Sequence, residues 1–183
     1  AGTPAAMKIT TGNLLRAVKY PDSGNAGTDL EDIDSDSSDV QSFAYNAQGQ
    51  KTYEKDQAGT IIETVFDTLG RETDRKVRGY GSGIDQAVER ISTTYLTRGL
   101  PDAVTQYDDP DSGSALDQVQ YSYDDWGNLA QFNQDVDSAI GVSGRAAFNV
   151  GYTYAKATGG RQTLRRATMT GTSMNTVTFL RLV

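Results

Sequence analysis

A short sequence pattern recurs along this chain of 183 residues: an aromatic residue, Asp or Asn, two variable residues and Gly. The clearest copy is YSYDDWGNL at 121–129, and weaker copies are FAYNAQGQK at 43–51 and TVFDTLGRE at 64–72. When the copies are aligned on the aromatic residue, successive aromatics stand 21, 29, 28 and 31 residues apart. The pattern is therefore an internal repeat stretched by insertions, and the fold must place one such unit after another.

Each copy is predicted to form a turn between two strands. Asp or Asn at the first position of a type I turn accepts hydrogen bonds from the backbone ahead of it, and Gly is favoured at the fourth position, where a positive φ is often needed. One copy has Leu96 where Asp or Asn is expected, and the last copy is one residue longer. The residues of this turn motif are Tyr45, Asn46, Gly49, Phe66, Asp67, Gly70, Tyr95, Gly99, Tyr123, Asp124, Gly127, Tyr154 and Gly159.

The segments between the turns alternate as strands do. In FNVGYTY at 148–154 the apolar and aromatic residues fall at every second position, and the same holds for VQYSY at 119–123. We therefore predict an all-β fold of repetitive antiparallel hairpins that form a continuous strip or shell. Since a lone hairpin is only marginally stable, the hairpins are expected to lie side by side. Residues 82–96 fit both a helix and a strand and are predicted to be a strand.

The prediction for the whole chain is a single repeat region over residues 1–183, with about five to six hairpin units. Insertions near 21–41, 79–86, 108–118 and 135–147 are predicted to be loops because they are rich in Gly, Ser, Asp and Pro. The chain is expected to be a piece of a longer protein.

Composition excludes several function classes. The net charge of −7 disfavours nucleic acid as a partner, because phosphate binding needs a basic surface. The chain has no Cys and no His, so thiolate chemistry and the commonest general base are absent. No stretch reaches the roughly 18 apolar residues of a membrane helix. We predict neither enzymatic activity nor a cofactor.

The repeat resembles the YD-repeat, or RHS-repeat, family. The best matches to the family's Tyr-Asp-x-x-Gly-Arg core are YSYDDWGNL, VFDTLGRET and FAYNAQGQK, and the resemblance covers about residues 9–170. It implies a large secreted or surface-exposed bacterial protein whose repeats form a β-strip that spirals into a shell. The expected function is thus a non-catalytic scaffold, shell or surface fibre, with an extracellular or cell-surface location. A cocoon segment enclosing a toxin payload is one alternative.

Carbohydrate binding is the second alternative, because some repeats of the family are linked to it. Trp126 is the only Trp of the chain and stands in a predicted turn near Tyr121 and Tyr123. An aromatic side chain offers flat apolar area that can stack on a sugar ring. Packing of Trp126 over the neighbouring hairpin is the competing interpretation.

An acidic run, DLEDIDSDSSD at 29–39, raises the question of calcium. Alternating carboxylates are how a calcium loop gathers oxygen ligands, and Asp32, Asp34, Asp36 and Asp39 stand close together here. The Gly and the distal Glu expected of such a loop are replaced by Ser37 and Phe43. A solvated loop without metal is the competing interpretation.

The ends of a strip of hairpins expose unpaired backbone groups. The segment NTVTFLRLV at 175–183 has no Pro and one charged residue, so nothing in it blocks strand pairing. We predict that edge strands pair with further repeats of the same chain or with other copies of it.

Overall fold

The computed structural model describes residues 13–20, 40–135, 138–141, 148–156, 162–171 and 174–180. Within these ranges every regular element is a strand and none is a helix, so the all-β prediction is confirmed. No described segment therefore has the length and apolar character of a membrane-spanning helix. The chain divides into two compact units, Ala1–Arg90 and Ile91–Val183.

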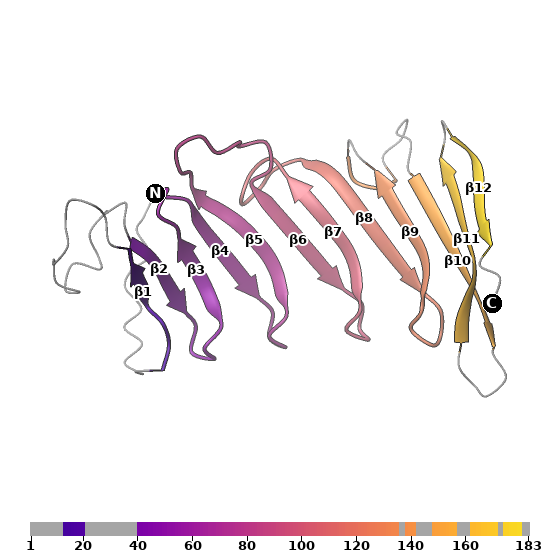
Figure 1. Ribbon diagram of the computed structural model, residues 1–183, viewed down its shortest axis with the longest axis horizontal. Helices are drawn as coiled ribbons and strands as arrows, with labels where there is room; N and C mark the ends of the chain where they lie inside the picture. The colour runs from indigo at the N-terminus through magenta and orange to yellow at the C-terminus, as the bar shows by residue number, and fades with distance from the viewer. Residues whose placement is uncertain are drawn as a thin grey trace. The chain divides into compact units, whose positions relative to one another are not determined.

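The first unit is an antiparallel meander in which each strand pairs with the next one along the chain. This order is visible in Figure 1 as a smooth change of colour from strand to strand. Its strands are β1 (Ala17–Lys19), β2 (Val40–Tyr45), β3 (Lys51–Lys55), β4 (Ile61–Phe66) and β5 (Glu72–Gly79).

The second unit repeats the same antiparallel topology. Its strands are β6 (Arg90–Tyr95), β7 (Pro101–Tyr107), β8 (Ala115–Tyr123), β9 (Leu129–Asp135), β10 (Phe148–Lys156), β11 (Gln162–Gly171) and β12 (Met174–Leu180). Because sequence neighbours are also sheet neighbours, each pair of adjacent strands is joined by a single connection. The predicted antiparallel hairpins are thus present in both units.

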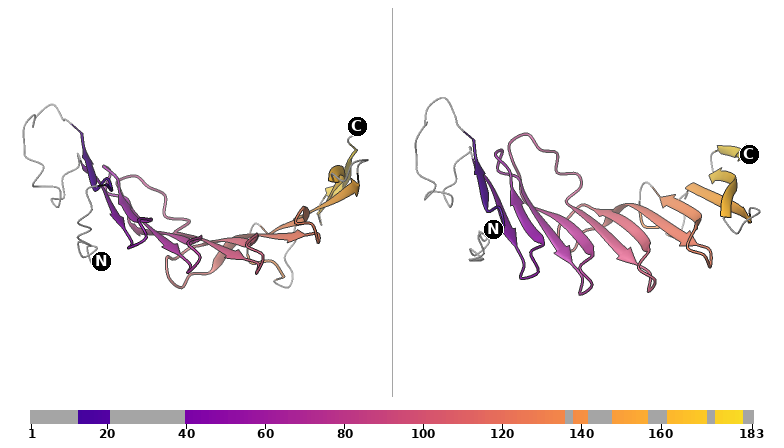
Figure 2. Two further views of the ribbon diagram at one scale, coloured as in Figure 1. Left: turned by 90° about the horizontal axis from the view of Figure 1, so that it is seen from below. Right: turned by 60° about the horizontal axis from the view of Figure 1, so that its bottom comes forward.

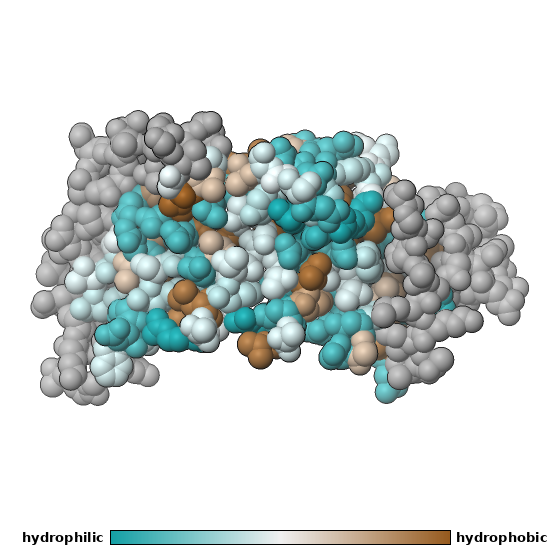
Figure 3. All heavy atoms as spheres, turned by 180° about the vertical axis from the view of Figure 1, so that it is seen from behind, coloured by the Kyte–Doolittle hydropathy of each residue, from teal (hydrophilic) through white to brown (hydrophobic). Residues whose placement is uncertain are grey.

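The strands of each unit form a single layer, as the edge-on view of Figure 2 shows. Among the described residues the only buried apolar side chains are Val40, 5% exposed, and Ala103, 8% exposed. Seen from behind, the described surface is mostly hydrophilic, with apolar residues in small separate patches (Figure 3). Stability in each unit must therefore come largely from the backbone ladder and from cross-strand side-chain pairs rather than from a deep core.

The loops differ in extent from those predicted. The segment 82–96 is a strand only from Arg90 onward, and residues 80–89 form an irregular loop that is longer than the predicted insertion at 79–86. Conversely, β8 begins at Ala115, so the insertion predicted at 108–118 ends earlier. In both places the sequence has apolar residues within a polar stretch, and strand pairing rather than composition decides where the loop ends.

Candidate functional site: the motif turns and the aromatic face

The repeated motif builds the same hairpin turn each time. At 46–49 the Gly49 N–H donates to the Asn46 carbonyl (2.9 Å), and the Asn46 N–H donates to the Gln50 carbonyl (2.9 Å). The glycines have positive φ, with 81° at Gly49 and Gly70, 85° at Gly99 and 82° at Gly127. This pattern is a type I turn followed by a left-handed residue, which is a common three-residue hairpin loop. We call the turns at 46–49, 67–70, 96–99 and 124–127 the motif turns.

In three of the motif turns the Asp or Asn side chain at the first position accepts hydrogen bonds from backbone N–H groups of the same turn. Asp124 Oδ1 accepts hydrogen bonds from the N–H groups of Trp126 (2.9 Å) and Asn128 (2.8 Å). Asp67 Oδ1 accepts in the same way from Leu69 and Arg71, at 2.9 Å each. The residue that follows the turn Gly also forms a side-chain hydrogen bond with the Asp: Asn128 Nδ2 donates to Asp124 Oδ2 at 2.8 Å.

These hydrogen bonds favour the ionised carboxylates. The backbone N–H of Arg71 is the main cause that lowers the pKa of Asp67, with its guanidinium adding to the effect. For Asp124 the side-chain amide of Asn128 is the main cause of the lowered pKa. Hydrogen bonds to the charged form of an acid stabilise that form, so each pKa lies below its usual value.

The turn with Leu96 shows that the carboxylate is not required for the backbone geometry. The Gly99 N–H donates to the Leu96 carbonyl (2.8 Å), and the Leu96 N–H donates to the Leu100 carbonyl (2.9 Å). These bonds match those of the other motif turns. The Asp or Asn therefore adds stability to a turn that the Gly and the strand register already allow.

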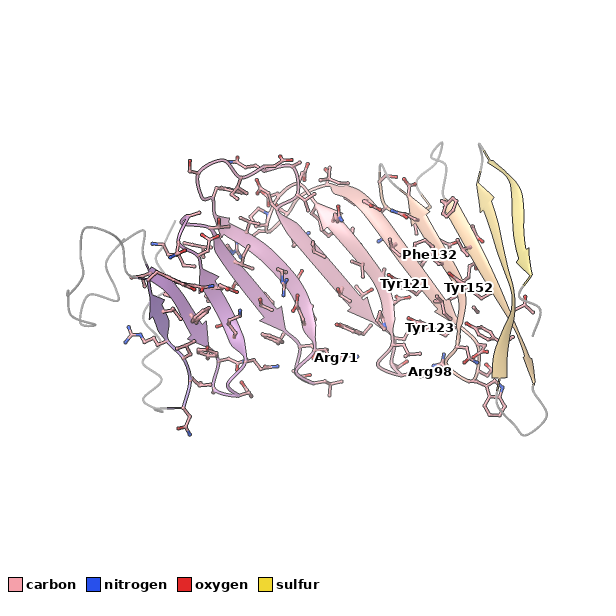
Figure 4. The ribbon with its side chains drawn as sticks, in the orientation of Figure 1. Arg71, Arg98, Tyr121, Tyr123, Phe132 and Tyr152 are labelled. Carbon is pink, nitrogen blue, oxygen red and sulfur yellow. The ribbon has the colours of Figure 1, made fainter. Side chains whose placement is uncertain are left out.

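Motif turns of one unit are linked directly to each other. In the first unit Gln50 Nε2 donates to the Gly70 carbonyl of the next motif turn (2.9 Å). In the second unit Arg98 Nη2 donates to the Asp124 carbonyl (3.2 Å), and Arg98 Nη1 reaches the carbonyls of Asp124 (3.3 Å) and Asp125 (3.4 Å). Figure 4 labels Arg98 at the turn between β6 and β7. Each link spans two strands, so long polar side chains hold successive repeats in register.

Two of the motif tyrosines make a second kind of link. Tyr45 Oη donates to the Leu15 carbonyl (2.8 Å), and Tyr154 Oη donates to the Leu129 carbonyl (2.9 Å). In each case the hydroxyl reaches backward along the chain to the strand region of the preceding repeat. Desolvation is the main cause that raises the pKa of Tyr154. The aromatic residue of the motif thus supplies both a ring for packing and a polar group that joins repeats.

One face of β8–β10 carries a group of aromatic residues. Tyr121 lies opposite Phe132, which in turn lies opposite Val150, and the Tyr121 and Phe132 rings are 5.8 Å apart at 60°. Figure 4 shows Tyr121, Tyr123, Phe132 and Tyr152 gathered over these strands. Desolvation raises the pKa of Tyr123. We define the aromatic face by Val119, Tyr121, Tyr123, Phe132, Val150 and Tyr152.

Trp126 lies apart from this face. It occupies the third position of its motif turn and is 78% exposed, and Leu69 at the same position of another turn is 76% exposed. In the described part of the chain no ring contact joins Trp126 to Tyr121 or Tyr123. The three residues proposed for sugar stacking therefore stand in two places, a turn tip and a sheet face.

The sequence did not predict a row of polar side chains on the face of the sheet opposite to the aromatic face. Thr105 is 5% exposed and Asp135 is 2% exposed, with Gln118 between them in the register of β7, β8 and β9. Gln118 Nε2 donates to Thr105 Oγ1 (2.8 Å), while Gln118 Oε1 accepts from the Ile140 N–H (2.9 Å). The row fixes residues 138–141 to the sheet, and its members are too far apart in sequence to form a motif.

Some predicted site residues fall outside the described residues. These are Gly159 of the turn motif and the proposed calcium ligands Asp32, Asp34, Asp36 and Asp39. Among the residues that are described, no group of three or more acidic side chains is placed to hold a metal ion.

Comparison with known proteins gives structural likeness only. No protein-family model and no curated protein matches the chain. It is similar to the crystal structure of TcdB2-TccC3-TEV, with 14% identity and a TM-score of 0.43, over 76% of this chain and 8% of that one. It is also similar to TcdB2-TccC3 without the hypervariable C-terminal region, with 14% identity and a TM-score of 0.26, over 76% of this chain and 9% of that one. Because both TM-scores are below 0.5, neither likeness supports an inference about function.

Proposed function

We propose that the chain is a non-catalytic structural repeat region, serving as scaffold, shell or surface fibre of a larger secreted or surface-exposed bacterial protein. The observation that carries this proposal is the motif turn, which is built alike on successive hairpins of each unit and linked to the next one. A residue pattern used this way serves architecture, because its side chains are occupied with hydrogen bonds to the chain's own backbone. The resemblance to the YD-repeat family supports the secreted or surface-exposed location.

Linear repeats make a specific test available. Residues 46–66 form one repeat, consisting of a motif turn, β3, a second turn and β4. A second copy of these residues inserted after Phe66 should fold, because each hairpin contacts only its neighbours. Circular dichroism should keep its β-type spectrum, and the urea m-value should rise with the added surface. An insertion that unfolds the protein would contradict the structural proposal.

The same architecture leaves the outer strands of the sheet, β1 and β12, with a neighbouring strand on one side only among the described residues. We propose that these edges pair with further repeats of the same chain or with other copies of it, since an unpaired strand edge is a template for another strand. Hydrogen exchange on the full protein measures this pairing. Alternate amides of β12 should be slow to exchange at high protein concentration and faster on dilution, if other copies are the partner.

Glycan binding is the second candidate function, and the exposure of Trp126 favours it. A Trp that is 78% exposed at a turn tip presents an apolar ring face to solvent. A glycan array with the parent protein, Trp126→Ala and Leu69→Ala tests whether Trp126 binds a glycan. Loss of binding only in Trp126→Ala would support the site, because Leu69 has the same turn position and a similar exposure. Binding that is absent, or equal in all three proteins, would rule out the glycan site at Trp126.

A further inference from the structure

The motif turn that carries Trp126 is held from two sides. Within the turn, Asp124 Oδ1 accepts hydrogen bonds from the N–H groups of Trp126 (2.9 Å) and Asn128 (2.8 Å). From the neighbouring motif turn, the Arg98 guanidinium donates to the carbonyls of Asp124 (3.2 Å) and Asp125 (3.4 Å). The backbone of the turn tip is therefore fixed, while the side chains of Asp125 and Trp126 are both exposed. A surface whose backbone is already ordered loses less conformational entropy when it binds a ligand.

The residue next to Trp126 at the turn tip has an unpaired carboxylate. Asp125 forms no side-chain hydrogen bond or ion pair with the described residues. The carboxylate of Asp124, in contrast, is used within the turn, because both of its oxygens accept hydrogen bonds there. Asp125 is thus the acid of this turn that can bind a ligand. An ionised carboxylate accepts hydrogen bonds and donates none, so the ligand must bring the donor.

The charge around this turn favours a cationic ligand. Residues 91–135, all of them described, contain eight Asp, no Glu and a single basic residue, Arg98. Its guanidinium is already bound to the carbonyls of the Trp126 turn. A sulfate or carboxylate group of a glycan would meet two carboxylates and one guanidinium there, so it would be repelled. A positively charged group would be attracted, and it would form a charge-assisted hydrogen bond with Asp125.

We propose that Trp126 and Asp125 bind a glycan that carries free amino groups, such as an oligomer of unacetylated glucosamine. This inference rests on the glycan-binding function proposed above for Trp126 and adds the class of sugar. The apolar face of a sugar ring stacks on the indole, and an ammonium group of the glycan donates to the Asp125 carboxylate. The indole face itself also attracts a cation. Acetylation removes the charge of the amine, so an acetylated sugar keeps the stacking and loses the ionic contact.

Intrinsic fluorescence reports on this site directly, because Trp126 is the only Trp of the chain. The full chain is titrated at mildly acidic pH, where sugar amines are protonated, with a short linear glucosamine oligomer and with its fully N-acetylated form. The unacetylated oligomer should shift the emission and bind about 3-fold to 10-fold more tightly than the acetylated one. Raising the pH until the amines lose their protons should remove this difference, and higher salt should reduce it.

Variants separate the roles of the two side chains. Asp125→Asn keeps the shape and removes the charge, so it should weaken binding of the unacetylated oligomer about 3-fold and leave that of the acetylated one unchanged. Trp126→Ala, measured by calorimetry because the fluorophore is gone, should lose binding of both. Asp85→Asn is the control for net charge and should bind like the parent, since Asp85 is an exposed acid of the first unit. Circular dichroism confirms folding, and Trp126→Leu replaces Trp126→Ala if that variant is unfolded.

The outcomes distinguish the sugar class from the glycan-binding function itself. Binding that needs Trp126 but is equal for the two oligomers would overturn the amino-sugar proposal and leave glycan binding in place. Equal weakening by Asp125→Asn and Asp85→Asn would also overturn it, because the attraction would then be that of an acidic protein for any polycation. Absence of binding to both oligomers would overturn the proposed sugar class, and a glycan array without any binding would remove the function on which it rests.

Discussion

At the scale of single residues, the motif turn shows which residue the turn conformation requires and which residue only stabilises it. Gly at the fourth position is present in every motif turn and always has positive φ, whereas the first position is Asn, Asp or Leu. A left-handed conformation strains any residue with a Cβ, so Gly is required by the backbone itself. The Asp or Asn contributes hydrogen bonds that the Leu96 turn lacks.

Leu96→Asp should therefore stabilise the protein. The new carboxylate would accept hydrogen bonds from the backbone N–H groups of Arg98 and Leu100, as Asp124 does from its own turn. We expect a gain of about 0.5–1.5 kcal/mol in the free energy of unfolding, measured by urea denaturation. Leu96→Ala is the control for removal of the leucine side chain. A Leu96→Asp protein no more stable than Leu96→Ala would show that the cap contributes nothing here.

Gly127→Val should destabilise the protein by backbone strain. Its φ is 82°, and an added Cβ would meet only Leu100 Cδ1, at 3.8 Å, so space is available and only the conformation resists substitution. We expect a loss of about 1–3 kcal/mol by thermal or urea denaturation. Gly127→Asn should lose much less, because Asn tolerates the left-handed region. Equal melting of Gly127→Val and the parent would contradict the turn assignment.

The turn carboxylates also predict how stability depends on pH. The pKa of Asp124 is lower in the folded state than its ordinary value, so the stability it adds is present above that ordinary value and is lost as the pH falls through the folded pKa. Asp124→Asn keeps an acceptor oxygen but cannot titrate. Urea denaturation from neutral pH down to strongly acidic pH should therefore show a shallower acid loss for Asp124→Asn than for the parent. Parallel curves for the two proteins would count against the lowered pKa.

At the scale of elements, the irregular loop at 80–89 is held against the turn that joins β3 and β4. A Cβ on Gly81 would lie 2.7 Å from both the Ala58 carbonyl oxygen and Thr60 Oγ1. The Val77 N–H also donates to the Glu89 carbonyl (2.8 Å), which closes the base of the loop. The loop is therefore packed against the rest of the first unit.

Gly81→Ala should disturb this contact, because the carbonyl at 2.7 Å belongs to the backbone and cannot move aside freely. We expect a loss of about 1–3 kcal/mol, the usual cost of overpacking. Ser82→Ala, at the neighbouring exposed position, should be nearly neutral. Proteolysis within residues 80–89 gives a second measurement, and it should be faster in Gly81→Ala alone.

The elements also show which features could be predicted from the sequence. Asp67 and Gly70 act within one five-residue turn, and so do Asp124 and Gly127, so local turn chemistry was enough to predict those turns. The links from Gln50 and Arg98 were not predictable, because the two residues occupy different positions of the motif and reach partners 20 or more residues away. The polar row of Thr105, Gln118 and Asp135 depends on register across three strands. The start of β6 at Arg90 was missed because Ile84, Ala87 and Val88 gave an apolar pattern to a loop.

At the scale of the whole molecule, two units of single-layer sheet bury little apolar surface. Contacts between strands are confined to neighbours in chain order, so the loss of one hairpin removes few contacts from the rest of its unit. Cooperativity must then pass from strand to strand through the ladder and through the turn links. This organisation differs from that of a globular domain, in which one core couples every element.

Urea unfolding should accordingly be weakly cooperative. We expect an m-value below that of a globular domain of the same length, because less surface is exposed on unfolding. Hydrogen exchange should show protection that decreases by steps from the middle strands of a unit toward its limits. A single sharp transition, with uniform protection across β2–β5, would indicate a covering layer that the described residues do not include.

The pairing of each strand with its sequence neighbour has a mechanical consequence. Force applied to the two limits of a unit across the strands would load the hydrogen bonds of one strand pair at a time, so the sheet would unzip at low tension. Force applied along the strands would load a whole ladder in shear, and rupture would need many bonds to break together. The links made by Gln50 and Arg98 lie at the turns, where peeling of a hairpin would begin. Such a chain resists being stretched along its strands far better than it resists being pulled open strand by strand.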